Sequence, residues 1–244
     1  MTVHMKSLVI FKVGDTFDRL SKQMGDFDRW IIDGIGYFPY PLSVIDPRKE
    51  NDLPDNAIVA GAIITGSHSM VTDRAAWSKN LATWLRSAVA MNIPILGICY
   101  GHQLLAHALG GDVGYHPGGI ELGSVSIKRT AEAVGDPLFS GMPEVFSAQV
   151  VHRQSVLRLP EKAVLLAENA FEPHHAYRVG DFAWGVQFHP EFSADAMAGY
   201  IDEVAENSHA DDAAPASSCH MAIPTTEAAS LLPRFAGLVK QRMN

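Results

Sequence analysis

The sequence predicts an α/β fold in which helices cover a mostly parallel, doubly wound sheet. Short apolar runs alternate with stretches of helical spacing through the first half of the chain, which is the order of elements in such sheets. The predicted strands show little polar alternation, as expected when helices cover both faces of the sheet. A cysteine flanked by glycines also lies where one of these strands gives way to a helix.

The elements of the first half can be assigned in chain order from their apolar spacing. The predicted strands are residues 7–13, 40–46, 57–65 and 93–98. The predicted helices are residues 17–24, 75–91 and 101–109. Glycines at 110 and 111 follow the last helix and supply the residue type that commonly ends one.

The second half of the chain differs from the first, because strand-like runs outnumber helices between residues 125 and 188. The predicted strands there are residues 145–151, 163–167, 176–179 and 182–188. We expect them to form a mixed or antiparallel extension of the same sheet. Helices are predicted over 194–205 and 225–241, and the Ala-, Ser- and Asp-rich segment 209–218 between them is predicted to be an exposed loop.

Length and composition indicate an ordinary globular protein, with 244 residues, of which 47% are apolar and 19% charged. We expect one domain over residues 1–244, with a core of about 7–205 followed by a loop and helix over 206–244. The net charge of -8 argues against a nucleic-acid partner. No apolar run reaches the roughly 18 residues of a membrane span.

Two cysteines, Cys99 and Cys219, are too few to indicate a disulfide framework in a chain of this length. The first residues also lack the apolar stretch and cleavage site of a secretory signal. A cytoplasmic location is therefore expected.

The most informative segment has the pattern G-x-C-x-G, formed by Gly97, Cys99 and Gly101. Small neighbours permit a sharp strand-to-helix turn, as in the nucleophile elbow of serine hydrolases. The positive end of the helix dipole favours a thiolate at this position. The backbone N–H of Tyr100 would point to a developing oxyanion. A buried structural cysteine is the alternative, and the flanking glycines argue against it.

A cysteine nucleophile needs a base, and the base needs a group that orients it. An apolar run leads to His189, and Glu191 lies two residues further on. Their side chains can leave the same side of an extended segment, and Pro190 stiffens the link between them. We therefore predict His189 as the base and Glu191 as its orienting carboxylate.

These two motifs resemble those of the class I, or triad, glutamine amidotransferases. Their marks are the elbow G-x-C-x-G-x-Q, which here includes Gln103, and a late H-P-E. The resemblance covers residues of about 8–192 and implies a flavodoxin-like, three-layer αβα fold. It also implies that the thiolate attacks the side-chain amide of glutamine, with a glutamyl thioester as intermediate.

The resemblance implies roles for further residues. A glycine-rich turn would supply a second oxyanion N–H, from Gly66 or Ser67, although this chain has Gly-Ser-His where many relatives have Gly-Gly-Pro. The residues implied in substrate binding are Gln103, Glu121, Gly123 and His152. A separate synthetase or acceptor subunit that uses the ammonia is a further implied partner.

Three functions remain open at this point. The triad serves equally well for glutamine and for a γ-glutamyl peptide or conjugate, because both present the same γ-carbonyl, and the chain also resembles γ-glutamyl peptidases. A non-catalytic regulatory protein on the same fold is the third, and an intact triad argues against it. We expect no metal site and no cofactor, because the sequence has no phosphate-binding loop and no convincing cluster of metal ligands.

Overall fold

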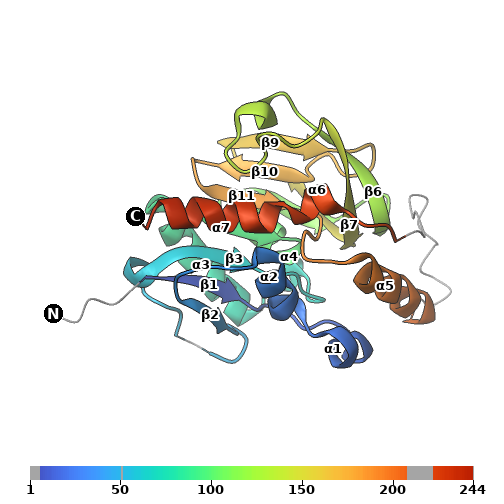
Figure 1. Ribbon diagram of the computed structural model, residues 1–244, viewed down its shortest axis with the longest axis horizontal. Coiled ribbons are helices and arrows are strands. Elements are labelled where there is room, and N and C mark those ends of the chain that lie inside the picture. Colours follow the sequence, from blue (N-terminus) through green and yellow to red (C-terminus); the bar gives the residue numbers. More distant parts are fainter. Residues whose placement is uncertain (1–5, 51, 208–221, 244) are drawn as a thin grey trace.

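The computed structural model describes residues 6–50, 52–207 and 222–243, and it contains a nine-stranded mixed sheet between layers of helices (Figure 1). The strand order is β2-β1-β3-β4-β11-β10-β9-β6-β7. Five neighbouring strands at one end run parallel: β2 (Leu42–Ile45), β1 (Ser7–Phe11), β3 (Val59–Ile64), β4 (Ile95–Ile98) and β11 (Ala183–Val186).

The remaining strands form the expected antiparallel extension of this sheet: β10 (Ala176–Val179), β9 (Ala163–Glu168), β6 (Glu121–Arg129) and β7 (Val145–His152). A separate two-stranded sheet, which the sequence analysis did not anticipate, pairs β5 (Asp112–Tyr115) with β8 (Gln154–Arg158). The strand β6 was also not predicted from the sequence. The predicted parallel sheet with an antiparallel extension is confirmed.

The helices cover both faces of the sheet, as the apolar strands indicated. Their bounds are α1 (Asp18–Met24), α2 (Phe27–Ile35), α3 (Ala76–Ala90), α4 (Tyr100–Ala108), α5 (Ala194–Asn207), α6 (Thr226–Ala229) and α7 (Leu231–Gln241). Short 3-10 turns lie at Asn56–Ile58, Val71–Asp73 and Glu132–Gly135.

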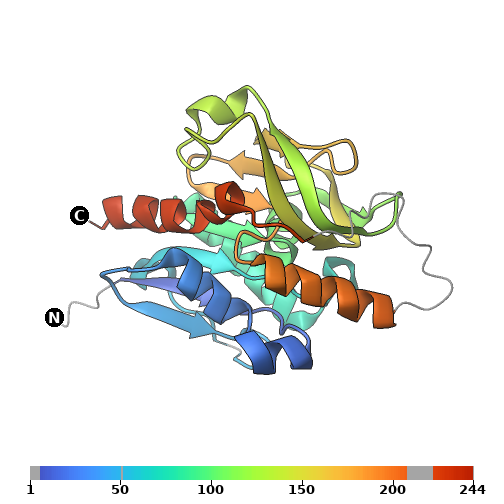
Figure 2. The same ribbon diagram turned by 45° about the vertical axis from the view of Figure 1, so that its right-hand side comes forward.

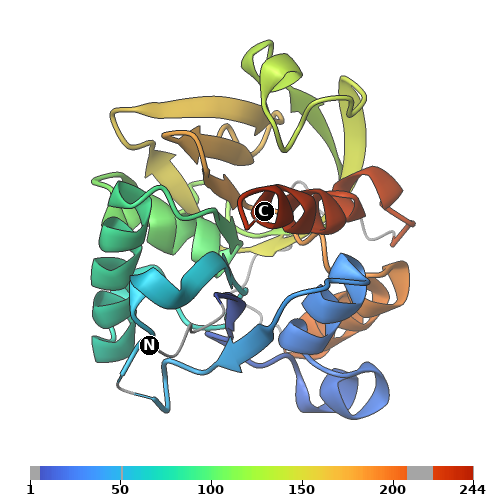
Figure 3. The ribbon, with the colours of Figure 1, turned by 60° about the vertical axis from the view of Figure 1, so that its left-hand side comes forward.

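Side chains alternate along β1, so that this one strand contributes to a core on each face. Leu8 and Ile10 pack in the core that includes α2 and α7, whereas Val9 and Phe11 pack in the core that includes α3 and α4. Figure 3 shows α7 (red) and α2 (blue) on the opposite side of the sheet from α3 and α4. A third apolar cluster joins α1, α2 and α5 (Figure 2).

The helix predicted over 225–241 is divided at Ser230 into α6 and α7. Pro233 explains this division, because proline has no N–H for the carbonyl four residues earlier and its ring crowds that carbonyl. The helix α2, which the sequence analysis missed, begins at Asp26, whose side chain accepts a hydrogen bond from the N–H of Phe27. The predicted loop over 209–218 and Cys219 lie outside the described residues.

The functional end of the sheet is set by the junction between β4 and α4. Cys99 lies between them with φ 49° and ψ −98°, a conformation that L-residues rarely adopt. Its N–H donates to the carbonyl of Val186 (2.9 Å), and its carbonyl accepts from the N–H of Gln103 (3.1 Å). A Cβ atom added to Gly97 would lie 2.4 Å from the carbonyl oxygen of Gly101, so the turn requires glycine at this position.

Gly97→Ala should therefore destabilise the protein by about 1–3 kcal/mol, since the backbone must move to admit the methyl group. Gly237→Ala is the matched control, because a Cβ there meets no atom within 4 Å and alanine favours the helix by about 0.5–1 kcal/mol. Urea unfolding should show opposite shifts in midpoint for the two variants. Equal urea midpoints for the two variants would contradict the close approach of Gly97 to Gly101 at this turn.

Candidate active site

Cys99 and His189 reach the same place because their strands are neighbours. β4 and β11 pair in parallel with Ile98 opposite Val186, so the residues that follow both strands emerge at one edge of the sheet. A Cβ atom added to Gly66 would lie 2.9 Å from Cε1 of His189 and 3.8 Å from Cβ of Cys99. The backbone of Gly66 therefore runs directly beside both side chains, and the predicted nucleophile and base are brought together.

Glu191, the predicted orienting carboxylate, lies beside the imidazole of His189. Nδ1 of His189 lies 2.8 Å from Oε1 of Glu191, and both side chains are buried. Since a carboxylate only accepts hydrogen bonds, Nδ1 is the donor, and Nε2 is the ring nitrogen left to exchange a proton with a substrate. No hydrogen-bond partner reaches Nε2 among the residues that the structure describes.

The charge of His189 is set by its two neighbours. Burial disfavours the imidazolium, but the charges of the Glu191 carboxylate and the Cys99 thiolate outweigh burial and raise the pKa of His189 to about 10 from its ordinary 6.5. The imidazole thus remains protonated through the neutral range. A protonated imidazole is the form that can give a proton to a leaving group.

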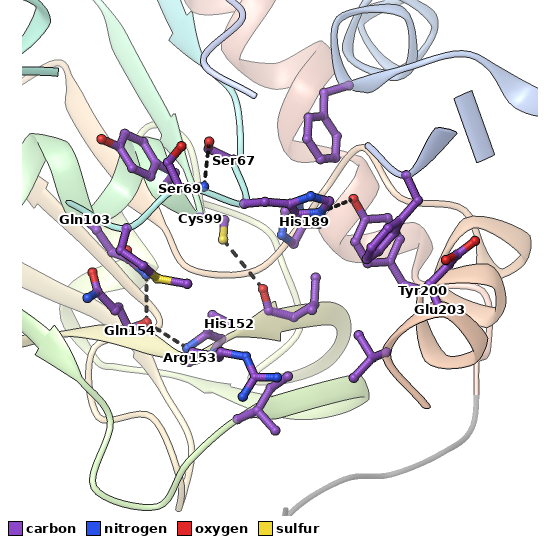
Figure 4. Close-up of a pocket in the computed structure, with 18 of the residues that line it drawn as sticks. Ser67, Ser69, Cys99, Gln103, His152, Arg153, Gln154, His189, Tyr200 and Glu203 are labelled. Atoms are coloured by element: carbon purple, nitrogen blue, oxygen red, sulfur yellow. Dashed lines mark hydrogen bonds between the residues drawn. The ribbon is translucent and has the colours of Figure 1, made fainter. Parts of the chain in front are cut away.

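The thiol itself lies at the floor of the pocket that Figure 4 shows. Sγ of Cys99 lies 3.7 Å from the carbonyl oxygen of Val151, to which the thiol can donate. Catalytic hydrogen bonds are often incomplete without substrate and close in the reacting complex.

Two backbone N–H groups are candidates for an oxyanion hole. Tyr100 is the first residue of α4, where an N–H has no acceptor within its own helix. The carbonyl of Gly66 accepts from Oγ1 of Thr65 at 2.9 Å. Ser67 lines the pocket and Gly66 is not among its lining residues, which favours Ser67 over Gly66 as the second donor.

The structure separates the four predicted substrate-binding residues into two groups. Gln103 and His152 line the pocket, while Glu121 and Gly123 are not among its lining residues. The amide of Gln103 donates to the carbonyl of Gln154 (2.7 Å) and to Oε1 of Gln187 (3.0 Å). Gln103 is thus held firmly by other parts of the chain.

Glu121 lies behind the pocket wall because β6 pairs with β7 in a register that puts Glu121 opposite His152. Its Oε2 accepts from Nε2 of His152 at 2.9 Å, and its Oε1 accepts from Asn169 at 2.8 Å. Burial opposes the charge of Glu121, but His152 and His175 outweigh burial and hold the pKa of Glu121 well below its ordinary range.

Both ring nitrogens of His152 face acceptors. Its Nδ1 lies 3.0 Å from the carbonyl of Gln154 and its Nε2 lies 2.9 Å from Glu121. These two contacts hold the ring in one orientation in the pocket wall. His189 differs, because its Nε2 has no hydrogen-bond partner among the described residues and can exchange a proton.

The cavity around these residues has a volume of about 330 Å³. Sequence reasoning missed part of its wall, because no motif marks these residues and they come from distant parts of the chain. The lining residues missed in this way include Phe17, Phe27, Met70, Ile120, Gln154 and Tyr200. The described residues include no group of three His, Cys, Asp or Glu side chains placed to hold a metal ion. None of the helices within the described ranges has the length and apolarity needed to cross a bilayer.

Comparison with protein families gives one match that covers most of the chain. The family model described as "Glutamine amidotransferase class-I" matches residues 25–203. Gamma-glutamyl peptidase 4 of Arabidopsis thaliana is 33% identical over 151 residues, 61% of this chain and 60% of that protein. The glutamine-hydrolysing GMP synthase of Thermosipho africanus is 40% identical over 118 residues, 48% of this chain and 21% of that protein. The matched regions therefore fall well short of the full length of these relatives.

Solved structures show the same fold. A glutamine amidotransferase from Methylobacillus flagellatus superposes with a TM-score of 0.70 at 22% identity, covering 99% of this chain and 94% of that one. A glutamine amidotransferase from Thermotoga maritima gives a TM-score of 0.68 at 18% identity, covering 99% of both chains. This likeness confirms the flavodoxin-like fold that the sequence motifs implied.

His189 should titrate near pH 10 in an NMR titration of its ring protons, assigned through His189→Gln. Glu191→Gln should move this midpoint to lower pH, because it removes the largest contribution that raises the pKa while the burial penalty remains. Glu144→Gln, on the exposed surface, should leave it unchanged. A midpoint near 6.5 in the unaltered protein would contradict the ion pair.

Proposed function

We propose that this chain, which belongs to the glutamine amidotransferase class-I family, hydrolyses the γ-amide of a glutamyl substrate through a thioester on Cys99. The observation that carries this proposal is the convergence of Cys99, His189 and Glu191 at the carboxyl ends of two adjacent parallel strands. L-glutamine is the first candidate substrate, with ammonia as the leaving group.

The first half of the reaction uses each group that the site holds. The Cys99 thiolate attacks the γ-carbonyl carbon, a C–S bond forms, and the carbonyl electron pair moves to oxygen. The N–H groups of Tyr100 and Ser67 stabilise that oxyanion. The oxyanion then collapses, the C–N bond breaks, and Nε2 of His189 gives its proton to the departing nitrogen.

The second half reverses these roles. Neutral His189 takes a proton from water as the water oxygen attacks the thioester carbon. Collapse of the second oxyanion breaks the C–S bond and releases glutamate, with the thiolate and imidazolium restored. Glu191 holds the imidazole in one orientation through both halves and stabilises its positive charge.

Gln103 and His152 are proposed to hold the glutamyl end of the substrate, because both line the pocket beside Cys99. Glu121 fixes the orientation of the His152 ring in the pocket wall and so acts through His152 as a positioning residue. Gly123 lies two residues further along β6, and the only role proposed for it is as part of the backbone of this strand.

The ammonia is proposed to serve a separate synthetase or acceptor subunit, since the related GMP synthase is glutamine-hydrolysing by name. We further propose that residues 1–244 act as one catalytic domain, because α7 packs into the same core as the sheet. We also propose a cytoplasmic location, since two cysteines are too few to indicate a disulfide framework.

A second candidate is the hydrolysis of γ-glutamyl peptides or conjugates. The cavity continues beyond His189 past Tyr200 to Asn207 at the end of α5, and ammonia needs no such space. Gamma-glutamyl peptidase 4 is also among the relatives. The reacting carbonyl and the triad are the same for both candidates.

Cys99→Ala should abolish turnover of both L-glutamine and γ-glutamyl peptides, because no thioester can form. Cys99→Ser should retain at most a trace, since a serine hydroxyl is a far weaker nucleophile beside the same base. Ammonia release and free glutamate are the measurements, with circular dichroism to verify the fold. Full activity of Cys99→Ala would overturn the assignment of the nucleophile.

A further inference from the structure

We propose that the side of the pocket next to His189 binds an aromatic group on the leaving amine, so that γ-glutamyl amides of alkylamines that carry an aromatic ring are substrates of this site. This inference rests on the proposed function, because it concerns the group that departs in the same reaction. It goes further by naming the chemical class of that group.

The triad fixes the side of the pocket on which the amine leaves. Nε2 of His189 is the ring nitrogen that Glu191 does not engage, and it delivers the proton to the departing nitrogen. The departing nitrogen must therefore lie next to His189. Figure 4 shows Tyr200 and Glu203 on this side of Cys99, and Gln103 and Gln154 on the opposite side.

The wall on the His189 side is built from aromatic rings. The ring of Phe17 lies 4.6 Å from that of His68 and 5.0 Å from that of Tyr200, between centroids. Phe27 stacks on His189 at 6.4 Å. All of these residues line the cavity. Edge-to-face and offset contacts with such rings favour a further aromatic ring.

This wall carries little charge. The hydroxyl of Tyr200 accepts from Thr16 at 2.9 Å and lies 3.3 Å from Nε2 of His68, so its polar end is already engaged. Burial, together with the positive charge of His189, lowers the pKa of His68 and keeps that ring neutral. Glu203 is paired with Arg19 at 2.7 Å. A neutral apolar substituent fits this surface better than a charged one.

The size of the cavity agrees with such an occupant. Its volume of about 330 Å³ lies within the range of pockets that hold small organic ligands. Val204, beyond Tyr200 on α5, continues the apolar lining away from the thiol. A glutamyl group with one attached ring would reach from His152 to this aromatic wall.

The test compares γ-L-glutamyl benzylamide with γ-L-glutamyl methylamide, which differ by one phenyl ring and have no charge on the leaving group. We expect kcat/KM for the benzylamide to exceed that for the methylamide by about tenfold or more, as burial of a phenyl ring predicts. Liquid chromatography of the released amines is the measurement. L-glutamine is assayed beside them.

Phe17→Ala should reduce this preference about tenfold, because Phe17 is the partly buried ring of the wall. Phe38→Ala is the matched control, since Phe38 is also partly buried but packs in another core outside the pocket. It should leave the preference unchanged.

Equal kcat/KM values for the two amides in the unaltered protein would overturn the inference, and so would turnover of L-glutamine alone. Both results would leave the proposed γ-amide chemistry intact. Failure to hydrolyse any of the three substrates would instead overturn the proposed function, and this inference with it.

Discussion

The backbone conformation of Cys99 is the constraint on which the rest of the site depends. A positive φ in a residue with a side chain costs on the order of 1–3 kcal/mol and persists only where the surroundings enforce it. Here the enforcing contacts are the ladder hydrogen bond to Val186, the first helical bond from Gln103 and the close approach of Gly97 to Gly101. The same turn directs the sulfur into the pocket and starts α4 immediately behind it.

Two buried histidine–carboxylate pairs flank the thiol, and their hydrogen bonds give them different tasks. His189 uses one nitrogen for Glu191 and keeps the other free among the described residues, so it can move a proton. His152 uses both nitrogens, for Glu121 and for a backbone carbonyl, so its ring is held in one orientation. We infer that one pair serves the reacting bond and the other serves substrate binding.

The sequence predicted the parts of the structure that local rules control. The elbow around Cys99 and the segment from His189 to Glu191 are short, and their neighbours along the chain determine their form. The sequence could not predict the aromatic wall, because Phe17 and Tyr200 meet only through the packing of α1 against α5. The position of Glu121 behind the pocket wall could not be predicted either, because the register of two antiparallel strands determines which way its carboxylate faces. The helix α2 could have been predicted, because Asp26 is a good N-cap for the apolar pattern that follows.

A glutamine analogue that carries an electrophilic chloroketone side chain, followed by peptide mass spectrometry, tests whether the site activates one thiol and presents it to a glutamyl group. We expect one label per chain, on Cys99, with Cys219 unmodified and with labelling slowed by excess L-glutamine. Equal labelling of both cysteines, without protection by L-glutamine, would contradict it.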